Sequence, residues 1–465
     1  MSPSRPATAR AIAARVLTRT DPQKADVVHV LAEFLRRTDE TQRTTDLVFG
    51  VLKVRCLIDA VIEKCSAVPV ERIPPEILNV LRVALYELIY CPRTPEHAVV
   101  DEAVDYAKHI TNTKQAGFVN AALRRTIRHI RSRQTPLSEA DPRRTLPQTP
   151  SAGCEFDTDI LPNPKGSPAD FLSAAFSLPR WLITGWLDEY GAEITRQICF
   201  AANRRPGIYL RPNTLRTTVE GLAEKLRSDG VRCDIVAEVD MVRVNSPGAI
   251  TALPGFAEGF FTVQDISANL PVRLLQPMPG WSILDLCAAP GTKTTQLAEL
   301  AADKAKIIAT DIDGERLKKV EENTARLGIK NVTVIEYEKL FENSKFSILN
   351  SQFDAVLLDV PCSNTGVLAR RPELRHRLTK NAIEGLADTQ LGLLRQAKEM
   401  VKSGAVLCYS TCSIQPQENN LLVRRFLAEN VSYRLKLEKL TLPSAEGFDH
   451  DGGYVAIMDS RASAP

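Results

Sequence analysis

The 465-residue sequence contains few features of secreted, membrane-spanning or metal-binding proteins. No apolar stretch reaches the roughly 20 residues that a membrane-spanning helix needs. Residues 1–15 include arginines but lack the uninterrupted apolar core of a signal peptide. The ten cysteines form no Cys-x-x-Cys pair, and none of the six histidines has zinc-site spacing to a cysteine pair. We therefore expect a cytoplasmic protein with no metal and no disulfide framework.

The composition is that of an ordinary globular chain long enough for two or three domains. Hydrophobic residues make up 44% and charged residues 25% of the sequence. The net charge of +3 comes from 59 basic and 56 acidic residues, so a nucleic-acid partner would have to bind local basic clusters. Five cysteines in apolar or mixed segments are predicted to be buried core thiols: Cys56, Cys65, Cys91, Cys199 and Cys233.

The most informative stretch is an apolar run at 281–286, a tight turn at Pro290-Gly291 and a helical pattern from Thr294. This strand–loop–helix layout is typical of a nucleotide-type cofactor site, with Asp311, twenty residues after Gly291, as the ribose carboxylate. One glycine instead of three favours S-adenosylmethionine over NAD, because no pyrophosphate needs a cradle. An ordinary strand–turn–helix is the alternative. The predicted cofactor loop consists of Cys287, Ala288, Ala289, Pro290, Gly291, Thr292 and Lys293.

Two later apolar segments each run into a polar loop with a cysteine. Phe353–Asp359 leads to Cys362, and Val406–Ser410 leads to Cys412. In an open α/β sheet, ligands bind at the carboxyl ends of the strands. We therefore expect Asp359, both cysteines and the cofactor loop to meet in one crevice.

These three segments together resemble the RNA cytosine-5 methyltransferases of the NOL1/NOP2/Sun family. They read Cys-Ala-Ala-Pro-Gly-x-Lys-Thr, Asp-x-Pro-Cys-Ser-x-Thr-Gly and Thr-Cys-Ser, and the likeness extends upstream through residues 253–256 and 263–268. The pattern is similar in particular to the bacterial 16S ribosomal RNA enzymes of the Sun/Fmu type. The resemblance covers most of the chain and implies a multidomain protein with a Rossmann-like methyltransferase domain.

Residues 1–133 are predicted to be helical, since apolar residues recur at helical spacing. This region resembles the NusB-like RNA-binding domain of the Sun/Fmu family. The end of the last predicted helix, 114–130, and the residues just after it contain five closely spaced arginines. These form either a solvated face or a phosphate-binding stripe. They are Arg124, Arg125, Arg128, Arg131 and Arg133. The other predicted helices cover 7–18, 27–36, 46–65, a segment beginning at Pro74-Pro75, and 97–110.

Residues 134–168 are rich in proline, serine, threonine and charge, which predicts an unordered linker with an incidental Cys154. Residues 169–270 are predicted to be α+β, and the resemblance implies a small RNA-binding subdomain there. Helices are expected from 177 and over 219–228, with strands at 207–211 and 241–244. Five polar residues near the first strand are either RNA contacts or ordinary surface residues: Asn203, Arg204, Arg205, Arg211 and Asn213.

Residues 271–465 are predicted to form a parallel, doubly wound sheet. The expected strands are 282–287, 306–311, 332–336, 354–359 and 404–410, and the helices are 294–302, 313–327 and 379–402. Residues 453–458 are expected to add an antiparallel strand. The family has an aspartate near the adenine after the third strand, and Glu338 is the nearest acidic residue here.

Methylation of cytosine at C5 requires a nucleophilic cysteine and an acid, and the sequence contains both types of residue in these motifs. A low-pKa cysteine can add to C6 and activate C5, and an acid near N3, for which Asp359 is placed, can stabilise the resulting charge. Asp359 is also expected beside the cofactor. The resemblance implies Cys412 as the nucleophile and Cys362 as the residue that assists release. Lys293 either lowers a thiol pKa or binds a phosphate, unless it is an ordinary helix-surface lysine.

We therefore expect a monomeric S-adenosylmethionine-dependent enzyme that methylates C5 of a cytosine in 16S ribosomal RNA. A transfer RNA cytosine is the alternative substrate. A binding factor that has kept the fold and lost the activity is the alternative class. Retention of both cysteines, Asp359 and the cofactor loop argues against such a factor.

Overall fold

The computed structural model describes residues 8–21, 27–245, 248–340 and 352–460. The chain divides into two compact units, which are treated separately below. The N-terminal unit contains residues 1–205 and 368–378, and the C-terminal unit contains 206–367 and 379–465. The first residue of the predicted helix 7–18 lies outside the described residues.

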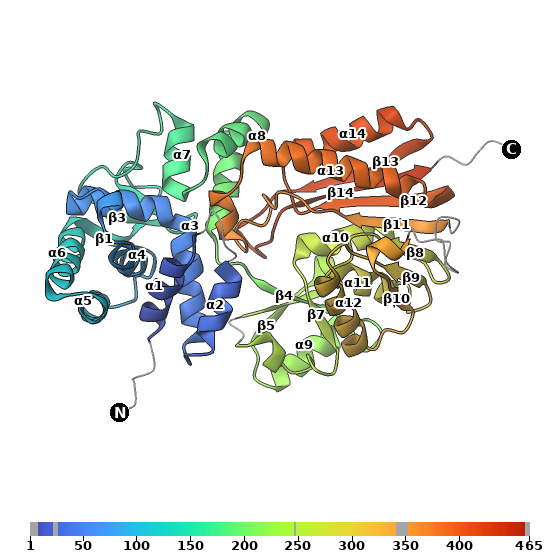
Figure 1. Ribbon diagram of the computed structural model, residues 1–465, viewed down its shortest axis with the longest axis horizontal. Coiled ribbons are helices and arrows are strands. Elements are labelled where there is room, and N and C mark those ends of the chain that lie inside the picture. The colour runs from blue at the N-terminus through green and yellow to red at the C-terminus, as the bar shows by residue number, and fades with distance from the viewer. Residues whose placement is uncertain (1–7, 22–26, 246–247, 341–351, 461–465) are drawn as a thin grey trace. The chain divides into compact units, whose positions relative to one another are not determined.

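The N-terminal unit begins with helices at the positions predicted from apolar periodicity (Figure 1). Helix α1 is capped by the Thr8 hydroxyl and α6 by the Asn112 side chain, while α4 begins at Pro75, where a missing N–H costs nothing. The buried apolar faces of α1, α3 and α4 pack on one another. The helices are α1 (Ala9–Arg19), α2 (Val27–Leu35), α3 (Thr41–Ser66), α4 (Pro75–Tyr90), α5 (Glu96–Ile110) and α6 (Thr113–His129).

The predicted unordered linker is instead largely folded. Strands β1 (Ile130–Pro136), β2 (Thr145–Pro147) and β3 (Ala152–Phe156) form an antiparallel sheet in the order β1-β3-β2. The prediction of disorder is wrong because three apolar side chains are fully buried, whereas Pro136 and Pro147 only end strands. The buried side chains are Leu146, Cys154 and Phe156, so Cys154 belongs to a core.

The N-terminal unit is completed by α7 (Pro168–Phe176), α8 (Arg180–Asn203) and a segment from much later in the chain. A short 3-10 helix, Pro372–His376, carries the buried Arg375. The Arg375 guanidinium donates hydrogen bonds to the carbonyls of Phe176 at 3.1 Å and Ala202 at 2.9 Å, and also to that of Lys53. The predicted methyltransferase domain thus lends a segment to the N-terminal unit, which sequence spacing did not indicate.

The C-terminal unit begins with a small four-stranded sheet in the order β5-β6-β4-β7. Strands β4 (Ile208–Pro212) and β6 (Met241–Val244) and helix α9 (Val219–Ser228) lie where predicted. Strands β5 (Cys233–Val236) and β7 (Phe261–Val263) were not predicted, since they are short and lack clear alternation. The apolar face of α9 packs on the sheet around Leu222 and Leu226.

The second sheet has seven strands in the order β10-β9-β8-β11-β12-β14-β13. The first five are parallel, and β14 is antiparallel to both neighbours, as expected for the strand at 453–458. Strand β13 was not predicted. The strands are β8 (Ser282–Asp285), β9 (Lys306–Ala309), β10 (Val332–Val334), β11 (Phe353–Asp359), β12 (Val401–Thr411), β13 (Tyr433–Thr441) and β14 (Gly453–Ser460).

Helices cover both faces of this sheet (Figure 1). Helices α13 (Lys380–Lys398) and α14 (Asn420–Glu429) pack on one face through residues such as Leu394 and Phe426. Helices α10 (Ile266–Leu275), α11 (Thr292–Leu300) and α12 (Gly314–Leu327) contribute buried residues to the other. The predicted doubly wound α/β fold is confirmed, and it gathers the carboxyl ends of the parallel strands at one edge.

The thiols predicted to lie in the core behave differently from one another. Cys65, Cys199 and Cys233 are buried, Cys91 is half-buried, and Cys56 is exposed. The prediction is wrong for Cys56 because α3 turns that position outward, next to Arg55, while Leu57 points into the core. In the described ranges, no three histidine, cysteine or acidic side chains are arranged to hold a metal ion. None of the described helices combines the length and apolarity needed to cross a bilayer.

Candidate active site

The predicted cofactor loop connects β8 to α11 by a tight turn. Gly291 has a φ of +96°, and a Cβ there would come within 3.1 Å of the Val320 backbone on α12. Glycine is therefore required both for the left-handed conformation and for the close approach. The alanines at 288 and 289 are small and nearly buried, so the loop presents mainly backbone.

Asp311 lies against this loop, as its spacing predicts. It follows β9, and its Oδ2 accepts a hydrogen bond from the Ala289 amide at 3.0 Å. Its Oδ1 accepts from the Asp313 amide at 3.0 Å. Two backbone donors thus hold the carboxylate at the carboxyl end of the strand next to β8.

Asp285 is a buried carboxyl at the end of β8 that the sequence did not single out. Its Oδ2 accepts a hydrogen bond from the Thr294 hydroxyl at 2.7 Å, and Oδ1 has no hydrogen-bond partner among the residues that the structure describes. Burial raises the pKa of Asp285 to about 7. The side chain therefore ties the strand to the first turn of α11 at an electrostatic cost.

Glu338, the predicted adenine-side carboxylate, lies in a short 3-10 helix, Tyr337–Leu340, after β10. Its side chain is exposed. This position at the carboxyl end of the third parallel strand is the one expected, and contact with a cofactor stays a prediction.

Cys362 and Cys412 meet as predicted for loops at the ends of neighbouring strands. Strands β11 and β12 pair in parallel up to Asp359 and Ser410, and a cysteine follows each. The two sulfur atoms are 3.1 Å apart. The Cys412 thiol also lies 3.0 Å from Oδ1 of Asn364, a residue the motif left unspecified.

The two thiols differ in environment. Cys362 is buried, whereas Cys412 is half-buried and lines a pocket. The hydrogen bond with Cys412, together with burial, raises the pKa of Cys362 well above its ordinary value. Cys362 is thus the thiol that keeps its proton, and Cys412 is the accessible sulfur.

Lys293 and Asp359 form an ion pair next to these thiols. Lys293 Nζ is 2.6 Å from Asp359 Oδ2, and the Ser410 hydroxyl donates to Oδ1 at 2.7 Å. Burial opposes a charge on Lys293, but the carboxylate of Asp359 outweighs it and raises the pKa of the ammonium. Lys293 is therefore a largely buried cation of the site, with 13% of its side chain exposed, and not a helix-surface lysine.

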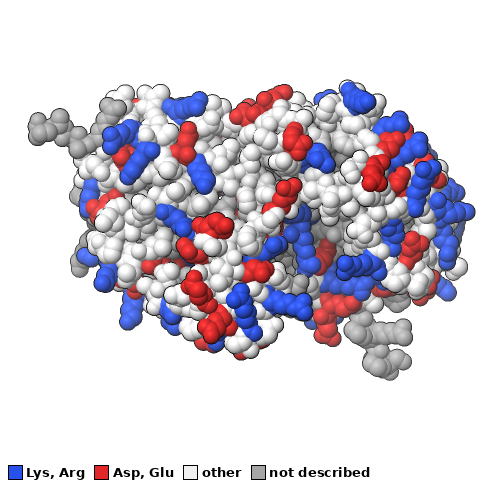
Figure 2. All heavy atoms as spheres, turned by 180° about the vertical axis from the view of Figure 1, so that it is seen from behind, with Lys and Arg blue, Asp and Glu red and all other residues white. Residues whose placement is uncertain are grey.

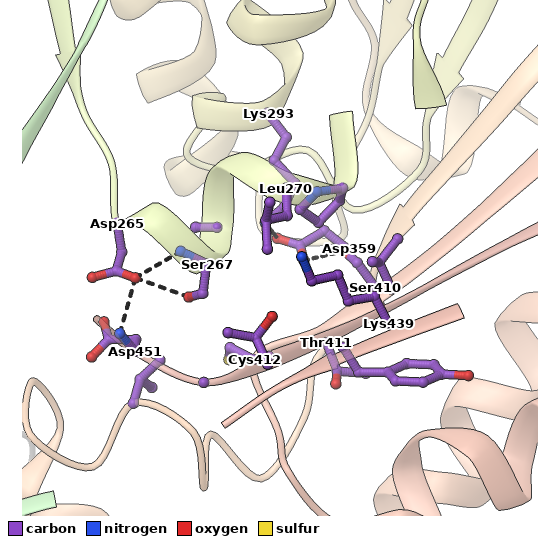
Figure 3. Close-up of a pocket in the computed structure, with 18 residues that line it drawn as sticks. Asp265, Ser267, Leu270, Lys293, Asp359, Ser410, Thr411, Cys412, Lys439 and Asp451 are labelled. Atoms are coloured by element: carbon purple, nitrogen blue, oxygen red, sulfur yellow. Dashed lines mark hydrogen bonds and ion pairs between the residues drawn. The ribbon is translucent and has the colours of Figure 1, made fainter. Parts of the chain in front are cut away.

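A pocket of about 80 Å³ joins these groups, and Figure 3 shows its lining. Asp265, at the start of α10, accepts hydrogen bonds from the backbone and hydroxyl of Ser267 and from the Asp451 amide. Sequence reasoning did not assign these residues or Lys439 to the site because they come from the start of α10, from β13 and from the loop before β14, outside the three motifs. The lining includes Asp265, Ser267, Lys293, Asp359, Ser410, Cys412, Lys439 and Asp451.

The predicted arginine stripe is divided by the structure. The Arg133 guanidinium donates four hydrogen bonds to the carbonyls of Glu87, Leu88, Cys91 and Thr94, at or just beyond the end of α4. Arg125 reaches the Cys65 carbonyl at 3.2 Å. These two residues therefore serve the fold. Arg125 nevertheless lies at an exposed position, as do Arg124, Arg128 and Arg131.

Arg211, Asn213 and Asn203 are likewise structural. The buried Arg211 pairs with both oxygens of Glu299 at 2.9 Å. Asn213 is fully buried and donates to two backbone carbonyls, and Asn203 donates to the Phe176 carbonyl. Burial excludes Arg211 and Asn213 from an RNA surface, and the half-buried Asn203 is engaged by the Phe176 carbonyl and by Arg375. The exposed face in Figure 2 carries both basic and acidic side chains.

A doubly wound sheet with a tight glycine turn after its first strand and two thiols at neighbouring strand ends defines the class of α/β enzymes with a nucleotide-type cofactor site. A family model described as 16S rRNA methyltransferase RsmB/F matches residues 272–457. The NusB family matches 7–128, and an RsmF/B-like ferredoxin-like domain matches 178–251.

Named relatives cover nearly the whole chain. It is 33% identical to a probable ribosomal RNA small subunit methyltransferase B from Synechocystis, over 89% of this chain and 86% of that protein. It is 34% identical to ribosomal RNA small subunit methyltransferase B from Serratia proteamaculans, over 92% and 91%. The solved structure of PH0851 has a TM-score of 0.71 at 26% identity and covers 97% of this chain and 99% of its own.

The chain therefore belongs to the RsmB/F methyltransferase family. This confirms the resemblance found in the three motifs and the predicted order of domain types, a NusB-like domain, a ferredoxin-like subdomain and a methyltransferase domain. The predicted boundaries at 133, 168 and 270 stay predictions.

Proposed function

We propose that this chain transfers a methyl group from S-adenosylmethionine to C5 of a cytosine in 16S ribosomal RNA, through a covalent bond between Cys412 and C6. The observation that carries the proposal is the thiol pair, with the half-buried Cys412 sulfur 3.1 Å from the Cys362 sulfur in a pocket shared with Lys293 and Asp359. The relatives' names, which specify the small ribosomal subunit, support the RNA substrate.

The loop 287–293 and Asp311 fit S-adenosylmethionine. A side chain at Gly291 would collide with Val320, and the alanines leave the backbone open to a ligand. These residues would hold the cofactor, with Asp311 on the ribose hydroxyls and Glu338 on the adenine side. S-adenosylmethionine would supply an electrophilic methyl group to C5 and leave as S-adenosylhomocysteine.

The chain's own residues account for the activation of C5. The Cys412 thiolate forms a bond to C6, and the electron pair of the C5–C6 double bond moves into the ring, so that C5 gains enamine character. Negative charge then builds near N3. We assign the stabilisation of this charge to the Lys293–Asp359 pair. Both Asp359 oxygens already accept hydrogen bonds, so the Lys293 ammonium is the group of the pair that has protons to donate.

Release reverses the first bond. A base removes the proton from methylated C5, the electron pair restores the C5–C6 double bond, and the Cys412 thiolate departs. Cys362, which retains its proton next to that sulfur, donates a hydrogen bond to the departing thiolate. Cys412 is thus the nucleophile, and Cys362 assists release.

The two cysteines are distinguished by replacing each with alanine. Cys362→Ala should attack and methylate but release slowly, giving a protein–RNA band that survives denaturing gel electrophoresis. Cys412→Ala and the double variant should give no band. A band in Cys412→Ala but not in Cys362→Ala would reverse the roles, and active single variants with no band would refute the covalent route.

The substrate is tested by bisulfite sequencing of cellular RNA with and without the protein. A cytosine in 16S ribosomal RNA should lose its protection when the protein is absent. Loss at a transfer RNA position instead would move the activity to that substrate.

A further inference from the structure

The buried carboxylate of Glu418 lies directly beneath the two cysteine loops. Glu418 ends a short 3-10 helix, Pro416–Glu418, between β12 and α14 and is fully buried. Its Oε1 accepts hydrogen bonds from the Ser363 amide at 2.8 Å and from Gln390 Nε2 at 3.0 Å. Its Oε2 accepts from the hydroxyls of Ser413, at 2.5 Å, and Ser363. All four donors are neutral.

Each serine held by Glu418 directly follows a site cysteine. Ser363 comes after Cys362, and Ser413 comes after Cys412. One carboxylate therefore links two loops that are about 50 residues apart in sequence. A second set of bonds closes the same frame, since the Ile414 amide donates to the Thr365 hydroxyl at 3.1 Å and the Gly366 amide to the Cys412 carbonyl at 3.0 Å.

Neutral groups could hold the two loops together by hydrogen bonds, but Glu418 also brings a negative charge. A buried charge costs free energy, and here neutral hydrogen bonds rather than a cation hold it. Its negative potential disfavours a second negative charge on the buried Cys362 sulfur, adding to the effects of the Cys412 hydrogen bond and burial. The charge of Glu418 therefore helps Cys362 to keep its proton.

We propose that Glu418 is a positioning residue that fixes the contact between Cys362 and Cys412 and places a negative charge beside the Cys362 loop. The inference rests on the proposed function for the roles of the two thiols. It adds a group that touches neither sulfur and acts through Ser363 and Ser413.

The other ionisable groups around the pair are few and can be held constant. Lys293 and Asp359 face Cys412 across the pocket, and Tyr409 lies behind, donating its hydroxyl proton to the Glu418 carbonyl at 2.6 Å. Asp265, Lys439 and Asp451 line the same pocket. A substitution at Glu418 replaces none of these residues, although burial and nearby charges, that of Glu418 among them, raise the pKa of Tyr409.

The test compares three substitutions in the full-length protein. Glu418→Gln keeps the shape and removes the charge, Glu418→Asp keeps the charge on a shorter side chain, and Glu418→Ala removes both. Glu429→Gln on α14 is the control, since that carboxylate lies away from the thiols and pairs with Arg395.

Alkylation of each cysteine by iodoacetamide is followed from pH 6 to pH 10 by peptide mass spectrometry. Cys408, a fully buried thiol of β12, reports any unfolding.

We expect Glu418→Gln to raise the alkylation of Cys362 relative to Cys412 at pH 8 by about tenfold, the change expected from one pKa unit. Glu418→Asp should keep the wild-type ratio, and the control should match the wild type. Overlap of the Glu418→Gln and wild-type profiles would overturn the proposal. If Glu418→Ala exposes Cys408 by unfolding, the Gln and Asp variants still decide the matter.

This readout needs neither RNA nor S-adenosylmethionine. A failure here leaves the Cys412 adduct experiment unaffected, and an absent adduct with altered alkylation would refute the proposed function while supporting the role of Glu418.

Discussion

The ammonium group of Lys293 lies 2.6 Å from Oδ2 of Asp359. This charge pair joins the predicted cofactor loop to the carboxyl end of β11. Lys293 enters from the first turn of α11, and Asp359 ends β11. The Cys412 thiol lines the same pocket. This pair therefore places the cation between the region assigned to the cofactor and the proposed nucleophile (Figure 3).

Removing this cation should slow the reaction of Cys412. In Lys293→Gln the positive charge near the Cys412 sulfur is lost, so less thiolate forms at a given pH. We expect alkylation of Cys412 at pH 8 to fall by about tenfold, equivalent to one pKa unit. Lys293→Arg keeps the charge and should lose less. Equal rates in Lys293→Gln and the wild type would show that the lysine does not support the thiolate.

Asp311 should contribute directly to S-adenosylmethionine affinity. Asp311→Ala removes the carboxylate held against the Ala289 amide, and calorimetry should show binding weakened by about 1.5–3 kcal/mol, the value of a charged hydrogen bond. Glu315→Ala on α12 is the control because that side chain is 83% exposed. Unchanged affinity in Asp311→Ala would remove the residue from the site, and NAD binding by the wild type would overturn the cofactor assignment.

The sequence was informative wherever strand order and motif spacing determine position. Asp311, Asp359 and the two cysteines end parallel strands, and the carboxyl ends of such strands share one edge whatever the loops do. Their convergence could therefore be predicted from the linear pattern. The helices of the N-terminal unit were predictable for a similar reason, since each buries one periodic face.

The sequence was less informative where long-range partners decide a side chain's role. Arg133 follows a run of arginines, yet it caps α4 because that helix end has carbonyls without helical partners. Glu418 follows the third motif as an ordinary acidic residue, and its role depends on a serine from a loop far away in sequence. Proline content predicted disorder at 134–168, but a few buried apolar residues were enough to order β2 and β3.

The role assigned to Arg133 leads to a local stability prediction. Arg133→Ala leaves four backbone carbonyls near the end of α4 without their donor, which should cost about 3 kcal/mol locally. Hydrogen exchange of a peptide covering 87–94 should therefore be faster. Arg131→Ala, at an exposed position, should leave that peptide unchanged. Equal exchange in the two variants would contradict the capping role.

The exposed arginines are the remaining candidates for RNA contact in the helical domain. Replacing Arg124, Arg128 and Arg131 with glutamine should weaken RNA binding and reduce the slope of log affinity against log salt by about one per lost phosphate contact. Activity on a short saturating substrate should survive. An unchanged slope would mean that these residues form an ordinary solvated face.

Asp285 predicts a pH dependence of stability with a definite sign. Its folded pKa is about 7, raised by burial from the unfolded value of 3.8, so the folded state binds the proton more tightly. The protonated carboxyl therefore contributes fully to the free energy of unfolding below about pH 4. This contribution is lost, by a few kcal/mol, as the pH rises from about 4 to about 7. Asp285→Asn is neutral at every pH and keeps an oxygen for Thr294. Its unfolding free energy, measured by urea denaturation, should gain on the wild type across this window and run parallel above it. A constant difference between pH 4 and pH 8 would show that the buried carboxyl does not titrate there.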